Sequence, residues 1–193
     1  LIKQLRAHTD KFIIIFYLGL SDGGIYAMAL SISIPIMLLN TSFDKILTPR
    51  IIRTFTNLQK RSIYMALLPY VSFAFAGLLI FSLIYYIFLN SIFDIFINET
   101  YSESLSLAHL IMIGIIFQGL NTVNMAAFSF FKQGILLSKL SYMIYVLQFL
   151  ISITLVNLMG LMGGALAYLF SYLVGFVITT IGLIKFQKNF IKI

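Results

Sequence analysis

The sequence has no cysteine and no tryptophan, and charged residues make up only 10% of its 193 positions. The absence of cysteine excludes disulfide bonds and thiolate metal sites. Charge is equally informative, because a soluble domain carries about 25% charged residues. A chain in which 61% of the residues are hydrophobic has too much apolar surface to hide from water. The low content of charged residues and the high content of hydrophobic residues together predict an integral membrane protein.

Two long stretches contain no charged residue, Ile63–Leu89 with 27 residues and Leu140–Ile184 with 45. About 20 apolar residues cross a bilayer, so the second stretch has room for two spans. We therefore predict an all-α integral membrane protein, a single helical bundle over residues 1–193. Its elements would be a partial span at about 1–18 and five full spans at 24–44, 63–89, 105–131, 140–159 and 163–184.

Glycine and proline mark the predicted turns. A short turn is expected at Gly19–Gly23. The stretch Asn157–Gly164 contains three glycines and would let the chain reverse between the last two spans. Pro35 and Pro69 lie inside predicted spans and are expected to kink them.

The charges divide unevenly between the two sides of this bundle. One side carries ten of the 13 basic residues, in the loop 45–62, the connection 132–139 and the tail after 184. The other side has no Lys or Arg and carries Asp22, Asp94, Glu99 and Glu103. The positive-inside rule then places the basic side and the C-terminus in the cytoplasm. Basic residues in such short loops do not predict nucleic-acid binding.

The opening segment places charges where a span should be apolar. Lys3, Arg6 and Asp10 share one helix face, and Lys11 adjoins it. If this helix is a span, all four charges lie at membrane depth, where they usually face a polar cavity or pair with each other. We interpret them as lining a substrate cavity, with Asp10 holding one cation and the remaining positive charge available to an anionic substrate. The alternative is that residues 1–11 are a cytoplasmic flank that obeys the positive-inside rule.

Uncharged polar residues form stripes on two predicted spans. Span 105–131 carries Gln118, Asn121 and Asn124, and span 140–159 carries Ser141, Tyr145, Gln148 and Ser152. Such groups either line a hydrophilic path and bind sugar hydroxyls, or they join neighbouring helices. For any single residue, helix joining is the commoner role. The candidates for the cavity are Gln118, Asn121 and Gln148.

Nothing in the sequence predicts catalysis, a bound cofactor or a metal site. His109 has no second ligand or carboxylate beside it, and the motifs of phosphate loops, zincins and serine hydrolases are missing. The tyrosines near the predicted outer boundary are typical of membrane-interface anchors; these are Tyr85, Tyr86 and Tyr101. We therefore expect a transporter rather than an enzyme.

The opening motif resembles a signature of the Wzx-type flippases, which export O-antigen and capsule polysaccharides in bacteria. It reads Asp10-Lys11-Phe12-Ile13-Ile14-Ile15-Phe16-Tyr17-Leu18-Gly19, followed by Gly24-Ile25-Tyr26. In that family, part of the multidrug/oligosaccharidyl-lipid/polysaccharide exporter superfamily, a similar run ends the seventh span and opens the eighth. Thr48-Pro49-Arg50 and the glycines of 160–164 agree with the pattern. Lys11 stands where arginine is usual, and Ile15 stands where glycine is common.

The resemblance covers essentially the whole chain, as the C-terminal half of a twelve-span transporter whose N-terminal half would precede Leu1. It implies translocation of undecaprenyl-diphosphate-linked oligosaccharides across the inner membrane, by alternating access, for surface polysaccharide and lipopolysaccharide biosynthesis. The implied partners are the lipid-linked oligosaccharide, membrane lipids and the missing half, with no nucleic acid and no cofactor. Lys3, Arg6 and Lys11 would then contact the anionic substrate.

Two alternatives stay open. A cation-coupled multidrug antiporter of the same superfamily would favour acidic or aromatic cavities, whereas the opening segment has three cations and one acid. A membrane polysaccharide polymerase or acyltransferase would need a cluster of catalytic residues. The outer loops offer only the acids Asp94, Glu99 and Glu103, without histidine or arginine beside them.

Overall fold

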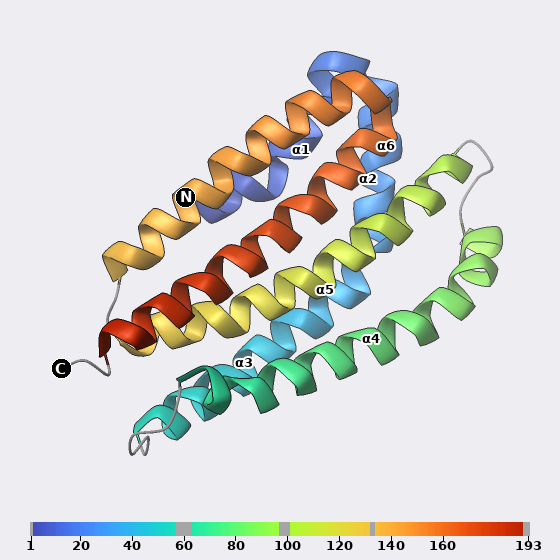
Figure 1. Ribbon diagram of the computed structural model, residues 1–193. Coiled ribbons are helices and arrows are strands. Elements are labelled where there is room, and N and C mark those ends of the chain that lie inside the picture. Colours follow the sequence, from blue (N-terminus) through green and yellow to red (C-terminus); the bar gives the residue numbers. More distant parts are fainter. Residues whose placement is uncertain (1, 57–62, 97–100, 132–133, 191–193) are drawn as a thin grey trace.

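The computed structural model describes residues 2–56, 63–96, 101–131 and 134–190. These residues form six α-helices and no strand (Figure 1). The helices are α1 (Ile2–Leu18), α2 (Leu20–Ile32), α3 (Ile34–Thr56), α4 (Ile63–Phe96), α5 (Ser102–Phe130) and α6 (Gly134–Phe190). The predicted all-α class is confirmed.

Three of these helices, α4, α5 and α6, are long and apolar enough to cross a membrane, and the bent pair of α2 and α3 makes a fourth candidate. Of the most apolar stretch in each helix, 67% is buried in α5 but only 17% in α4. Helix α5 lies in the middle of the bundle and packs against α2, α3, α4 and α6. The exposed face of α4 carries large apolar side chains such as Phe73, Leu83 and Ile87. Such a surface is typical of contact with lipid.

The span predicted at 24–44 is broken near its middle. Helices α2 and α3 meet at Ser33 and are bent by 48°. Pro35 follows the break, and because proline has no N–H it cannot complete the helical hydrogen bond to the carbonyl four residues earlier. Beside the break, the Ile32 carbonyl accepts a hydrogen bond of 2.8 Å from the Tyr85 hydroxyl of α4. This contact attaches α4 to the bent segment.

Helix α3 continues well into the stretch predicted as a basic loop. It passes through Pro49 and ends at Thr56. Its buried face carries Leu47, Ile51 and Phe55, which pack in one cluster with α4, α5 and α6. Burial of three large apolar side chains, each worth about 1.5–3 kcal/mol, offsets the helical hydrogen bond that Pro49 cannot make.

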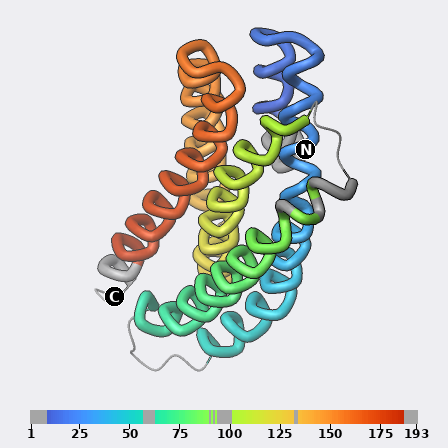
Figure 2. The backbone as a smooth tube through the Cα atoms, turned by 90° about the vertical axis from the view of Figure 1, so that its right-hand side faces the viewer, coloured from blue at the N-terminus to red at the C-terminus, as the bar shows by residue number. Residues whose placement is uncertain are grey.

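Helix α6 is continuous along the chain except at Gly160, where the backbone has φ +61° and ψ −136°. The chain reverses there, so that the first limb of α6 (134–159) and its second limb (161–190) lie side by side (Figures 1 and 2). A side chain at Gly163 would collide with the backbone carbonyl of Leu155, so the limbs approach closely at the turn. The reversal falls inside the predicted turn 157–164, but only Gly160 leaves the helical conformation.

The other boundaries differ from the predicted ones by a few residues. The turn expected at Gly19–Gly23 is confined to Gly19, which has φ +101°, and Gly23 already lies inside α2. Gly23 leaves the space into which the Ile15 side chain of α1 packs. Helix α4 extends beyond the predicted Leu89 to Phe96. Glu99, assigned to the outer loop, lies outside the described residues.

Candidate functional site

The carboxylate of Asp10 lies inside the bundle. Asp10 is only 4% exposed. Its Oδ2 accepts a hydrogen bond of 2.9 Å from the Gln148 Nε2, and its Oδ1 accepts one of 2.7 Å from the Ser152 Oγ. One turn away, the hydroxyls of Thr9 and Tyr145 are 3.4 Å apart and share a hydrogen bond. The polar stripe predicted on 140–159 therefore faces α1.

Apolar packing holds Asp10 in this place. The next turn of α1 buries Ile13 and Ile14 in the same core as Tyr26 and Ala165. Gly164 lets α1 come close, because a side chain there would meet the Ile14 Cδ1 at 2.6 Å. The turn of α6 and the apolar face of α1 thus fix the register in which Asp10 meets Gln148 and Ser152.

Three buried tyrosines form a cluster near this carboxylate. Tyr26 of α2 is 0% exposed, and Tyr168 and Tyr172 of the second limb of α6 are 5% and 6% exposed. Tyr26 lies within electrostatic range of both Asp10 and Tyr172, and the rings of Tyr168 and Tyr172 are 4.8 Å apart. Among the described residues, the buried Tyr26 hydroxyl has no hydrogen-bond partner. The cluster therefore keeps one donor available for a further polar group.

The cations predicted beside Asp10 are described only in part. Lys3 and Arg6 belong to α1, but their side chains lie outside the described residues. Lys11 is partly exposed, and it forms no ion pair or hydrogen bond with any residue that the structure describes. The described partners of Asp10 are neutral groups of α6.

The polar stripe on α5 faces the second limb of α6. The Oδ1 of Asn121 accepts a hydrogen bond of 2.9 Å from the Thr179 hydroxyl. Asn124 donates to the hydroxyls of Thr179 and Thr180, at 3.2 and 2.9 Å. Both asparagines are buried, so these hydrogen bonds join the two helices.

Gln118 lies on the same face of α5, one turn earlier. Its Oε1 accepts a hydrogen bond of 3.3 Å from Tyr168. This contact connects the α5 stripe to the tyrosines around Asp10. Of the predicted cavity residues, Asp10 and Gln148 meet directly, and Gln118 contacts Tyr168, which lies within electrostatic range of Asp10.

The tyrosines predicted as interface anchors occupy different surroundings. Tyr86 is 52% exposed, and its ring lies 4.7 Å from that of His109. The Tyr85 hydroxyl donates to the Ile32 carbonyl inside the bundle, and Tyr101 packs against the larger apolar core of the bundle.

The three tyrosines around Asp10 were not predicted as part of a site. A tyrosine in an apolar span is typical of an interface anchor, and no local pattern distinguishes one that turns inward. Their common position depends on which helices become neighbours.

Comparison with protein-family models, with curated proteins and with solved structures finds no significant match to this chain.

Proposed function

We propose that this chain forms one helical half of a bacterial inner-membrane flippase for undecaprenyl-diphosphate-linked oligosaccharides. In this proposal the chain has five full spans and a partial first span, with its C-terminus in the cytoplasm. A second half, which would precede Leu1, completes the cavity, because alternating access needs two bundles around a central site. The proposal is drawn from the motif at residues 10–26 and from the position of Asp10.

The observation that carries the proposal is the burial of Asp10 beside the middle of the first limb of α6. Gln148 lies 14 residues after Gly134 and 12 before Gly160, about 20 Å from the start of the limb at 1.5 Å per residue. A carboxylate at this depth argues against a solvated flank for residues 9–11, because a flank would leave Asp10 in water. An ionisable residue at membrane depth is by default a candidate for a functional site, such as a substrate or ion pathway.

The neighbouring groups suit a glycan linked to a diphosphate. Arg6 precedes Asp10 by about one turn of α1 and Lys3 by about two, and Lys11 follows it. These cations suit an anionic diphosphate or acidic sugar, for which guanidinium groups are good ligands. Gln118 and the tyrosine hydroxyls offer uncharged donors and acceptors for sugar hydroxyls. Asp10 positions α1 against α6 through Gln148 and Ser152.

The proposal is tested in the native cells after deletion of the gene and complementation with variants of the intact protein. The deletion strain should lose surface polysaccharide and accumulate lipid-linked oligosaccharide. Arg6→Ala should lower surface polysaccharide at least about tenfold, because loss of a charge-assisted contact costs about 1.5–3 kcal/mol. Immunoblots of membrane fractions should show unchanged protein.

Glu103→Gln is the matched control, since Glu103 is an exposed acid at the start of α5, far along the chain from the proposed cavity. It should restore polysaccharide fully. Normal polysaccharide in the deletion strain would overturn the proposal. If that strain instead became sensitive to cationic drugs, the antiporter alternative would gain support.

A further inference from the structure

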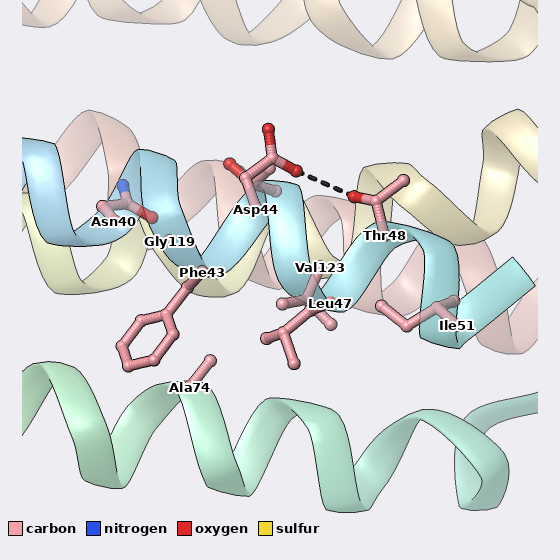
Figure 3. Close-up of a pocket in the computed structure, with 10 residues that line it drawn as sticks. Asn40, Phe43, Asp44, Leu47, Thr48, Ile51, Ala74, Gly119 and Val123 are labelled. Atoms are coloured by element: carbon pink, nitrogen blue, oxygen red, sulfur yellow. Dashed lines mark hydrogen bonds between the residues drawn. The ribbon is translucent and has the colours of Figure 1, made fainter.

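A second cluster of polar side chains lies between α3, α4 and α5, separate from the cluster around Asp10. A small pocket there is lined by apolar side chains and by Asn40, Asp44, Thr48 and Thr122. Figure 3 shows Phe43 directed toward Ala74 of α4, whereas Asp44 and Thr48 project from another side of α3. Asn40, Asp44 and Thr48 follow at intervals of four residues and therefore share one face of the helix.

Each of the two threonine hydroxyls of this pocket donates a hydrogen bond to another group. The Thr48 Oγ1 donates to the Asp44 Oδ1 at 2.9 Å, and the Thr122 Oγ1 donates to the backbone carbonyl of Gln118 at 3.0 Å. A hydroxyl that donates keeps its lone pairs as acceptors. Within the described residues, Asp44 has no other hydrogen bond and no ion pair. The pocket therefore has a surplus of oxygen acceptors and one negative charge.

Asn40 adds an amide that is nearly buried and unbonded. It is 7% exposed and forms no hydrogen bond with any residue that the structure describes. Its Oδ1 lies over Gly119 of α5, where an added Cβ would stand 2.7 Å from that oxygen. Its polar atoms keep some exposure to solvent, so the amide oxygen is accessible as a further acceptor for a ligand in the pocket.

We propose that this pocket binds one monovalent cation, with Na⁺ as the best fit. Hard cations prefer the oxygen ligands found here: a carboxylate, an amide and two hydroxyls. A single carboxylate balances a single positive charge. The space inside the pocket, about 10 Å³, is close to that of one water molecule and therefore suits one small ion.

Two residues of the pocket on α3 are in contact with solvent. Asp44 and Thr48 are partly exposed, and Lys45 and Arg50 beside them are exposed. Neither cation pairs with Asp44 in the described structure, so the carboxylate is available to an ion. The inference does not depend on the proposed substrate, because no residue of the pocket belongs to the cluster around Asp10.

The test is thermal unfolding of the full chain, purified in detergent and followed by circular dichroism. NaCl is titrated into choline chloride at constant ionic strength, with KCl as a second series. A ligand that binds only the folded state raises the unfolding midpoint in a saturable way. We expect such a rise with Na⁺, and no saturable rise with choline.

Asp44→Asn should abolish the Na⁺-dependent rise, whereas Glu103→Gln removes an exposed acid and should leave it unchanged. Thr48→Val keeps the Asp44 charge and the shape of the threonine side chain, so it still tests Na⁺ binding by the pocket if Asp44→Asn does not fold. It should weaken the apparent Na⁺ affinity about tenfold, which corresponds to about 1.4 kcal/mol. Equal midpoints in Na⁺ and choline would mean that the pocket holds only water and would overturn the proposal, as would an unchanged Na⁺ response in both variants.

Discussion

At the scale of single residues, the bundle stabilises the Asp10 carboxylate in a position that is shielded from water. Transfer of an ion into a low-dielectric interior costs several kcal/mol even after relaxation. Asp10 recovers part of this cost through Gln148 and Ser152, whose donors replace water. Hydrogen bonds to charged groups are worth about 1.5–3 kcal/mol each. The neutral donors therefore stabilise the charge and attach α1 to α6 at the same time.

Gly160 is the residue on which the hairpin of α6 depends. Its φ of +61° and ψ of −136° fall in a region that side chains with a Cβ rarely adopt. Nothing lies within 4 Å of where a Cβ would be, so a substitution there would be strained by the backbone alone and not by crowding.

We expect Gly160→Ala to lower the free energy of unfolding by about 1–3 kcal/mol, measured by denaturant unfolding in detergent micelles. Gly24→Ala is the control. Gly24 also has no neighbour within 4 Å but lies inside the regular helix α2, where alanine should stabilise by up to about 1 kcal/mol. Equal effects of the two substitutions would show that the reversal does not require the left-handed backbone.

At the scale of helices, polar side chains join α5 to α6. Thr179 is fully buried and accepts a hydrogen bond from Asn124. Its one proton is shared between the Asn121 Oδ1 at 2.9 Å and the carbonyls of Gly175 and Phe176 at 3.0 Å. Between helices in a membrane, lipid removes the hydrophobic driving force, so packing and hydrogen bonds determine which faces meet. The asparagine–threonine contacts thus specify the register of α5 against the second limb of α6.

Thr179→Val keeps the shape of the side chain and removes its hydroxyl, leaving Asn121 without its donor. We expect a loss of about 1–2 kcal/mol in the free energy of unfolding. The control is Thr154→Val, because the Thr154 hydroxyl is exposed and bonds only to carbonyls of its own helix. If both variants lost the same amount, the contact would not be specifying the pairing of the helices.

At the scale of the whole molecule, the charge asymmetry predicts an orientation. Helices α4 and α5 meet near residue 100, and α5 and α6 meet near residue 132. Because α5 is long enough to span the bilayer, these two connections should lie on opposite sides. The basic connection is expected in the cytoplasm.

The natural lack of cysteine allows a direct test of this orientation. Ser102→Cys and Ser138→Cys place single thiols at exposed positions near the two connections. In intact spheroplasts, a membrane-impermeant maleimide should label Ser102→Cys, whereas Ser138→Cys should react only after permeabilisation. The reverse pattern would invert the topology, and labelling of both without permeabilisation would exclude a span between them.

Some features of the site could be predicted because they depend on spacing along one helix. The stripe of Tyr145, Gln148 and Ser152 follows from 100° per residue, and the structure confirms that these residues share a face toward α1. The partner could not be predicted, since Asp10 is 138 residues from Gln148. The pocket at Asp44 was missed for a similar reason, because Thr122 and Gly119 reach it from another helix.

The sequence by itself determined the all-helical class, the apolar lengths and the place where the chain reverses, since hydrophobicity, charge and glycine act locally. Tertiary structure decided where helices end. Helix α3 continues through Pro49 to Thr56 because burial of Leu47, Ile51 and Phe55 outweighs the loss of a helical hydrogen bond. It also decided which polar groups meet. A buried side chain satisfies its hydrogen bonds with whichever neighbour packing brings within about 3 Å, and that neighbour is set by the arrangement of helices rather than by position in the chain.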